Sequence, residues 1–295
     1  MALLLSVLEQ GLIYGLMALG VYITYKILDF PDMTTDGSFP LGASLTAMLL
    51  TKGVNPWLTL IVAFGAGALA GVCTGLIHVK LKVRDLLAGI IMFTGLYTVN
   101  LRIAGGKANV PLFNQQTIFK NDMLGSLMPE FLSGCQVALV ALILALLIKL
   151  LLDIFLKTKS GFLLRAAGDN PTLVTTLAKD IGMVKIFGLA LGNGLVALGG
   201  CVFAQQQRFF DMTMGTGTVV IGLASVIIGT SLFKNVYFLK PTTAVLIGSI
   251  LYKGCVALAI SCGLAATDMK LVTAAAFLVI LVISMDRKKK VKSNA

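Results

Sequence analysis

The chain has 295 residues, of which 57% are hydrophobic and only 13% are charged, against roughly 25% charged residues in soluble domains. These proportions exclude an ordinary soluble protein, and because apolar stretches recur along the whole chain they also exclude a soluble protein with one anchor. The net charge of +11 does not indicate nucleic-acid binding, because the basic residues gather in short connectors and form no basic face with interleaved aromatics.

Long apolar runs follow one another along the chain. A helix of about 20 apolar residues crosses the hydrocarbon core and satisfies its own backbone hydrogen bonds there. We therefore predict an all-α polytopic membrane protein with about nine transmembrane segments. In chain order the segments are 2–25, 39–50, 56–79, 86–104, 133–156, 184–204, 219–233, 241–262 and 271–285. The second and seventh are too short to cross alone and follow polar, glycine-containing stretches, which indicates broken helices.

Basic residues set the expected orientation. They gather at 78–84, 157–165 and 287–292, and an even number of predicted helices separates each cluster from the next. The positive-inside rule therefore places all three on the cytoplasmic side and the N-terminus outside. A signal peptide over 1–25 is the alternative, but no basic segment precedes the apolar run, and Glu9 and Gln10 interrupt it.

Acidic and hydroxyl side chains precede the first short segment. Ionisable groups at membrane depth cost roughly 2.5–3.5 kcal/mol on insertion scales, so Asp32 and Asp36 require an explanation. Asp32 either caps a helix at the cytoplasmic interface or lines a substrate path. Asp36 stands where a half-helix begins, whose N-terminus presents free N–H groups. Thr34, Thr35 and Ser38 provide hydroxyls for caps or for a polar lining.

Two later helices carry isolated polar residues. In 86–104, Thr94, Tyr97 and Asn100 recur every third residue, which places them along one side of an apolar helix. Asn193 lies between two glycines in 184–204. Interhelical hydrogen bonding and substrate contact are both open for these residues.

Metal and disulfide chemistry have little support in the sequence. The five cysteines stand singly with no CxxC pair, and His78 is the only histidine. We interpret the cysteines as small buried hydrophobic residues and predict neither a metal site nor a disulfide.

The stretch before the first short segment has an echo before the second. Asp32-Met-Thr-Thr-Asp-Gly is followed five residues after its glycine by Gly42, and Asp211-Met-Thr-Met-Gly-Thr-Gly five residues after its last glycine by Gly222. An odd number of crossings separates the copies, which predicts an inverted repeat around the helix 133–156. Asp211 itself is expected in an outer loop near Arg208, with a place on the path as the alternative.

A cytoplasmic helix is predicted between the two halves. Asp169 or Asn170 caps it, Pro171 suits its first turn, and Gly182 ends it. One apolar stripe runs along it, formed by Leu173, Val174, Leu177, Ala178 and Ile181. Such a helix either rests on the lipid surface or fits a groove on a soluble partner.

Several of these motifs resemble one family. The SGFLLRAAGDNP stretch within 159–182 resembles the coupling-helix loop of permease subunits in bacterial ATP-binding-cassette importers, in the superfamily of branched-chain amino acid and ribose permeases. Residues 18–43 and 219–233 resemble the broken second helix of that family and its counterpart in the second half. DFPD-x-T-x-DGSFPLGA and LY-x-x-NLRI (96–103) are similar to the subgroup linked with tryptophan or tyrosine uptake.

The resemblance implies one transmembrane permease domain over 1–295 in the membrane of a bacterial cell. Its parts are a first half (1–132), a central helix (133–156), a coupling loop (157–183), a second half (184–286) and a basic tail (287–295). The implied partners are cytoplasmic ATPase subunits, an extracytoplasmic substrate-binding lipoprotein and a second permease copy, for which we expect a homodimer; lipid surrounds the complex and no nucleic acid takes part.

The resemblance also implies roles for particular residues. Those expected near the translocation path are Asp32, Thr34, Thr35, Asp36, Ser38, Tyr97 and Asn100. We add Asn193 to these residues because of its isolated position in an apolar helix. Those expected to couple to the ATPase are Gly168, Asp169, Asn170, Pro171, Leu173, Val174, Leu177 and Ile181.

The function expected is inward transport of a small solute by alternating access. The chain has no GxxxxGK[ST] loop, so we expect no enzyme activity and no cofactor on this chain, with ATP and magnesium on the partner. An amino acid is the preferred solute, since half-helix ends receive a carboxylate; a sugar or apolar solute is not excluded. The alternative is a stand-alone secondary transporter or channel that uses Asp32, Asp36 and Glu9 as ion sites.

Overall fold

The computed structural model describes residues 2–120, 135–176, 180–234, 236, 238–261 and the single residues 271, 274, 275, 278 and 282. In this part of the chain seven helices are long and apolar enough to span a membrane. The prediction of an all-α polytopic membrane protein is therefore confirmed. The ninth predicted segment, 271–285, and the basic tail lie almost wholly outside the described residues.

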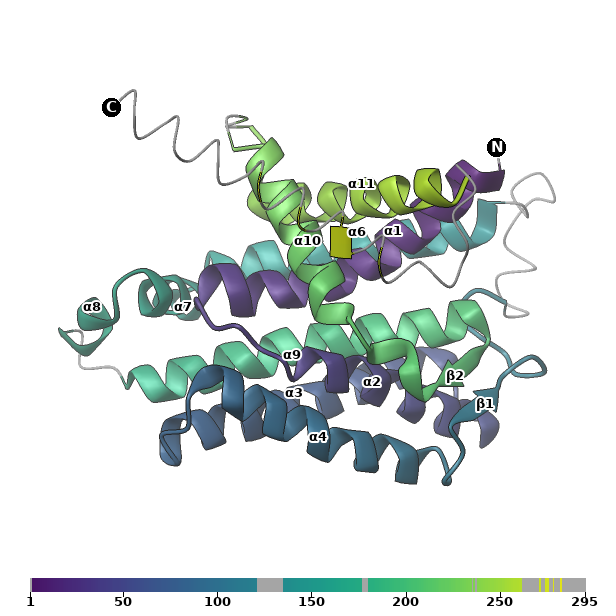
Figure 1. The fold of residues 1–295 in the computed structure, drawn as a ribbon, viewed down its shortest axis with the longest axis horizontal. Coiled ribbons are helices and arrows are strands. Elements are labelled where there is room, and N and C mark those ends of the chain that lie inside the picture. Colours follow the sequence, from purple (N-terminus) through teal and green to yellow (C-terminus); the bar gives the residue numbers. More distant parts are fainter. Residues whose placement is uncertain are drawn as a thin grey trace.

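The elements follow the predicted order (Figure 1). The first half contains α1 (Ala2–Val21), the π-helix η1 (Tyr22–Ile27), α2 (Thr35–Thr51), α3 (Pro56–Lys80), α4 (Asp85–Ile103) and β1 (Asn109–Pro111). The centre and second half contain α6 (Gln136–Leu156), α7 (Lys159–Asp169), α8 (Pro171–Thr176), α9 (Ile181–Gln207), β2 (Phe209–Asp211), the 3-10 helix η3 (Met212–Gly215), α10 (Thr218–Leu232) and α11 (Pro241–Ser261).

Both predicted broken helices are present. The first is α2, of 17 residues, which follows the irregular stretch 28–34 after η1. The second is α10, of 15 residues. It is separated from η3 by Gly217, whose φ of +87° is in the left-handed region that favours glycine and interrupts the helical winding.

The two halves pack in the same way when their helices are matched. In this correspondence α1 is equivalent to α9, α2 to α10 and α3 to α11. α1 lies antiparallel against α11, as α9 does against α3. A Cβ on Gly42 of α2 would lie 1.8 Å from the backbone oxygen of Ala197 in α9. A Cβ on Gly222 of α10 would lie 2.7 Å from Val21 in α1. The glycines that echo each other in sequence therefore occupy equivalent packing positions, as an inverted repeat requires.

The basic connectors meet at one end of the bundle. The chain passes Gly168 of α7 against the backbone of Ile27, and Lys185 lies 3.3 Å from His78 at the end of α3. Figure 1 shows α7 and α8 at this end, and the N-terminus and the β1–β2 pair at the other. Under the positive-inside rule the end with α7 is cytoplasmic, and the N-terminus lies outside.

The boundaries of the predicted coupling helix were wrong. Ile181 and Gly182 do not close a helix that starts at Pro171; they open α9, whose N-cap is Asp180, with its carboxylate accepting from Gly182 N at 2.8 Å. The preceding segment is instead divided into α7, capped by Thr158, and the short α8. Leu177 and Ala178 lie outside the described residues.

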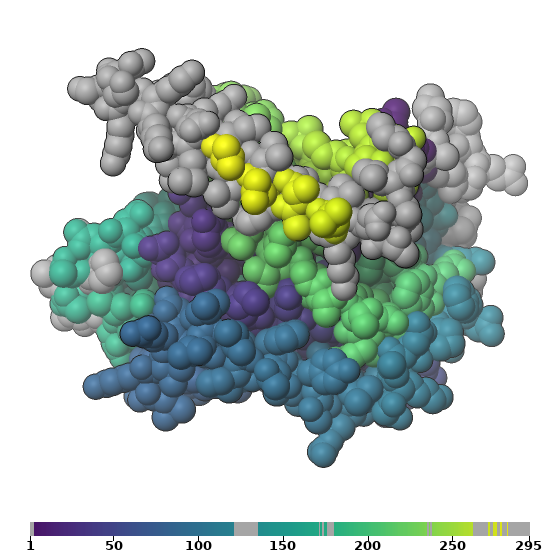
Figure 2. Space-filling view, viewed as in Figure 1, coloured from purple at the N-terminus to yellow at the C-terminus, as the bar shows by residue number. Residues whose placement is uncertain are grey.

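Apolar side chains cover the outside of the bundle, as lipid requires. Figure 2 shows α3 and α4 in blue along one whole edge of the molecule, and both helices carry exposed large hydrophobic residues, among them Ile61, Leu69 and Ile91. α9 packs between α1, α2 and α3, and most of its residues from Gly188 onward are buried. The glycine-rich α9 is thus the core helix against which the half-helix α2 packs, whereas α10 packs against α1 and α11.

Candidate functional site

The N-termini of the two half-helices meet at Asp36. This residue is in the first turn of α2, and its carboxylate accepts hydrogen bonds from the N-terminus of α10: from Val219 N at 2.8 Å, Gly217 N at 3.2 Å and the Thr218 hydroxyl at 2.8 Å. The free N–H groups of a helix N-terminus favour an anion. Asp36 therefore supplies to α10 the negative charge that α10 lacks in its own first turn.

A buried polar network ties α2 to the core helix α9. Asp32 is buried, and its carboxylate accepts from Thr34 N at 2.8 Å and from the Asn193 amide at 2.6 Å. The Asn193 oxygen in turn accepts from the Ser38 hydroxyl at 2.7 Å. Thr35 donates to the Asp32 backbone oxygen. Because each buried polar group here has a partner, the network fixes the start of α2.

The same segment is also tied to α3 and α4. The hydroxyls of Thr34 and Thr74 lie 2.9 Å apart, and the Asn100 amide donates to the backbone oxygen of Gly37 at 3.0 Å. The Asn100 amide oxygen is buried without a hydrogen-bond partner among the described residues.

The structure separates the residues expected on one side of α4. Asn100 is buried against α2, whereas Tyr97 is 53% exposed and Thr94 is also exposed. In a single chain Tyr97 therefore faces away from the half-helices. The place of either residue on a substrate path stays a prediction.

Asp211 lies in the outer loop, away from this network. It is in β2, which pairs with β1 at the N-terminal end of the bundle, opposite Asn109. Burial opposes ionisation of its carboxyl, but hydrogen bonds from Thr213 and Asn109 outweigh it and hold the pKa below its ordinary value. The structure thus places Asp211 in the outer loop, as expected, and a place on the path stays a prediction.

The residues predicted to couple the chain to a partner lie at the cytoplasmic end. Gly168 packs so tightly that a Cβ there would lie 1.9 Å from the oxygen of Ile27, the last residue of η1. Asp169 and Asn170 are exposed, and the Asn170 side chain accepts from the Thr172 hydroxyl. Val174 is buried, and the side chains of Pro171 and Leu173 are outside the description. α7 is therefore a fixed link between α8 and the segment that leads into α2.

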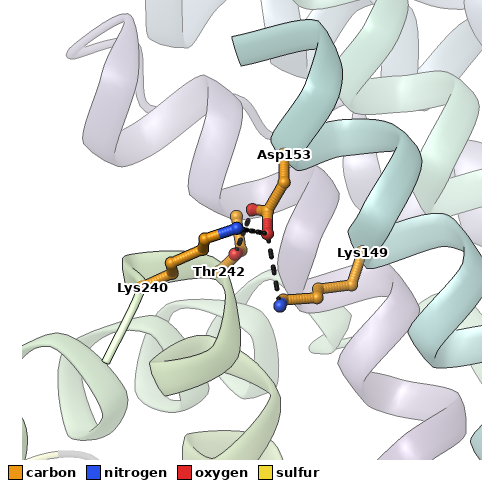
Figure 3. Close-up of polar contacts among 4 residues, drawn as sticks. All are labelled: Lys149, Asp153, Lys240 and Thr242. Atoms are coloured by element: carbon orange, nitrogen blue, oxygen red, sulfur yellow. Dashed lines mark hydrogen bonds and ion pairs between the residues drawn. The ribbon is translucent and has the colours of Figure 1, made fainter. Parts of the chain in front are cut away.

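A charged cluster joins the central helix to the second half. Figure 3 shows Lys149 and Lys240 both reaching Asp153 of α6, at 3.2 and 3.1 Å. The other carboxylate oxygen accepts from the Thr242 hydroxyl in the first turn of α11. Sequence analysis missed this cluster. The i,i+4 pair of Lys149 and Asp153 was visible as a local signal, but the contact with 240–242 depends on the fold.

Sequence analysis also missed Lys253, a cation in the middle of α11. Its Nζ lies 3.6 Å from the ring centroid of Tyr14. That ring is stacked against Phe39 at 5.9 Å and meets the edge of Phe203 at 5.2 Å. A desolvated cation–π contact contributes about 2 kcal/mol, less than the roughly 2.5–3.5 kcal/mol that a charged residue costs at membrane depth. The single lysine in a long apolar run was the available signal.

Comparison with known proteins identifies the family. Residues 3–283 match the model of the family described as "Branched-chain amino acid transport system / permease component". The chain belongs to this family. Its members are transport permeases rather than enzymes. With seven apolar spans in the described part alone, this chain is a multi-pass permease of the bacterial plasma membrane.

Individual relatives agree with this assignment. The chain is 44% identical to a "Tyrosine transport system permease protein" of Clostridioides difficile, over 99% of this chain and 95% of the relative. It is 28% identical to a "Probable branched-chain amino acid transport permease protein LivH" of Methanocaldococcus jannaschii, over 76% of this chain and 73% of the relative. It is also 28% identical to an "Autoinducer 2 import system permease protein LsrC" of Salmonella typhi, over 77% and 62%. No solved structure gives a significant match.

Proposed function

We propose that this permease imports an amino acid, with aromatic amino acids preferred, and that a separate ATPase drives the transport. Support for the solute is the 44% identity to a tyrosine transport permease along almost the whole chain. Support for the mechanism is the pair of half-helices whose N-termini meet at Asp36, the arrangement that transporters use near the membrane midplane.

The proposed movement begins at the cytoplasmic side of the membrane. ATP and magnesium bind to a pair of ATPase subunits, which close and push on the exposed end of α8. α7 passes this movement to Ile27 through the tight contact at Gly168. From there the chain leads directly into Asp32 and α2, so the half-helices shift against each other and open the path to each side in turn. A substrate-binding lipoprotein and a second copy of the permease complete the complex.

The alternative, an ion-driven transporter that uses Asp32 and Asp36, receives less support. Both carboxylates already accept several hydrogen bonds from the fold, so neither is a free ion ligand. The deciding measurement is solute uptake into proteoliposomes that contain the purified permease with its ATPase. We expect uptake only with ATP; uptake by the permease alone under an ion gradient would refute the proposal.

The lever itself is tested by enlarging the residue at its contact point. In Gly168→Val the new side chain collides with the backbone of Ile27, so we expect ATP hydrolysis to continue while uptake falls at least about tenfold, the equivalent of 1.4 kcal/mol of coupling. Gly95→Ala on α4 is the matched control, because a Cβ there meets nothing within 4 Å. Normal uptake by the valine variant would remove α7 from the mechanism.

A further inference from the structure

A cavity opens between the outer halves of α1 and α11. Deeper in the membrane the two helices are in close contact: Ser249 donates to the Gly11 oxygen at 2.7 Å, and a Cβ on Gly15 would lie 2.7 Å from Leu246. Beyond that contact, towards the N-terminus of α1, the helices leave a cavity of about 410 Å³. This volume falls in the range of small-molecule sites.

The lining of this cavity combines one cation with a few polar groups. Lys253 lies in its wall together with the amide of Gln10 and the hydroxyls of Ser6 and Ser261, and the other lining residues are apolar. Within the described residues the only ion pairs are those of Asp153, so Lys253 has no carboxylate partner there. Its ammonium has three donors and the Tyr14 ring occupies one side of it. The lysine therefore offers an unneutralised charge to the cavity.

The cavity is also connected to the half-helix α2. The Tyr14 ring beneath Lys253 is stacked on Phe39, which follows Ser38 of the buried network. The Tyr14 ring thus connects Phe39 with Lys253, so a movement of α2 at Phe39 would be passed on to Lys253. The cavity lies at the outer end of the bundle, the side from which an importer receives its solute.

We propose that this cavity is the outer binding site for the transported solute, with Lys253 binding the solute's carboxylate. Gln10 and the two serine hydroxyls then accept from the ammonium group of an amino acid, and the apolar wall contacts its side chain. The inference rests on the proposed import of an amino acid and names the residue that recognises the group common to all amino acids.

The charge of the cavity is measured without reference to transport. In a full-length chain with its native cysteines replaced by alanine, Ala257→Cys places a thiol in the cavity wall. We expect an anionic methanethiosulfonate to react with it about tenfold faster than a cationic one, because the lysine concentrates anions locally. Lys253→Met should abolish this preference and Lys253→Arg should keep it. An unchanged preference in Lys253→Met would overturn the proposal, provided that the variant elutes as a folded protein in size-exclusion chromatography.

Binding is tested by protection of the same thiol. Tyrosine, leucine and glycine should slow its reaction with the anionic methanethiosulfonate, whereas tyramine and isoamylamine, which lack the carboxylate, should not. Lys253→Met should lose the protection, and Lys52→Met, which removes an exposed lysine at the outer end of α2, should retain it. Equal protection by the amines, or none by any of the amino acids, would overturn the carboxylate site.

The two proposals fail in distinguishable ways. Protection by leucine but not by tyrosine supports the carboxylate site and removes the aromatic preference. Uptake under an ion gradient alone contradicts the proposed energy source, whereas the thiol experiments continue to report on Lys253.

Discussion

The segments at the starts of the two half-helices have similar sequences, but their acidic side chains make different contacts. Before α2, Asp32 is buried and bound to Asn193, and Asp36 reaches the N-terminus of α10. Before α10, the matching Asp211 lies in the outer loop, where its carboxylate bonds to Thr213 and Asn109 among the residues that the structure describes. The first half therefore supplies the negative charge for both half-helices. An inverted repeat can keep its packing symmetry while its ionisable groups become asymmetric.

The most damaging way to break this asymmetry is to remove Asp36. Asp36→Ala leaves the Gly217 and Val219 N–H groups at the start of α10 without this acceptor, while the Thr218 hydroxyl keeps its bond to the Gly215 oxygen. Hydrogen bonds to charged groups contribute roughly 1.5–3 kcal/mol each. We expect a loss of about 4 kcal/mol, measured as lower thermal stability in detergent. Asp36→Asn should lose less, because its amide oxygen still accepts. A fully stable alanine variant would show that α10 does not depend on the first half.

A second variant pair compares the equivalent glycines. In Gly42→Ala the new methyl group would meet the backbone oxygen of Ala197 at 1.8 Å, whereas in Gly222→Ala it would meet the Val21 side chain at 2.7 Å. A side chain can move aside more readily than a helix backbone, and overpacking costs about 1–3 kcal/mol. We expect the loss of stability, measured by thermal melts, to be near the upper end of this range for Gly42→Ala and near its lower end for Gly222→Ala. Equal losses would contradict the stated difference between the two contacts.

The smallest effect is expected at Asp211. This residue caps η3 at the surface, so Asp211→Ala should cost about 1 kcal/mol. Because hydrogen bonding lowers the pKa of the folded state, the stabilisation is present above the unfolded pKa and disappears as the pH falls through the folded one. The stability difference between the wild type and this variant, followed by thermal melts at decreasing pH, should therefore close on acidification. A constant difference would assign the effect to something other than the carboxylate.

The sequence was sufficient for the spans and for the position of Asp36, because hydropathy and helix-start signals are local. It did not reveal that Asp36 caps a helix 181 residues further along the chain, since that contact depends on how the halves pack. The predicted end of the coupling helix was misplaced because glycine commonly ends helices, which made Gly182 look like a stop. In the structure Asp180, two residues earlier, is the N-cap that starts α9. Lys253 was missed because one charged residue hardly lowers the mean hydropathy of a long apolar run.

The π-helix η1 gives the contact at Gly168 a further consequence. Its wider winding holds one residue more than an α-helix would, as the hydrogen bond from Leu28 N to the Ile23 oxygen shows. A change of η1 from π-helix to α-helix would free one residue to lengthen the connection to α2 and would rotate the segment that follows. The backbone would exchange one set of internal hydrogen bonds for another. In the proposed mechanism, a push from α7 would therefore act on a helical segment that can change its length just before α2.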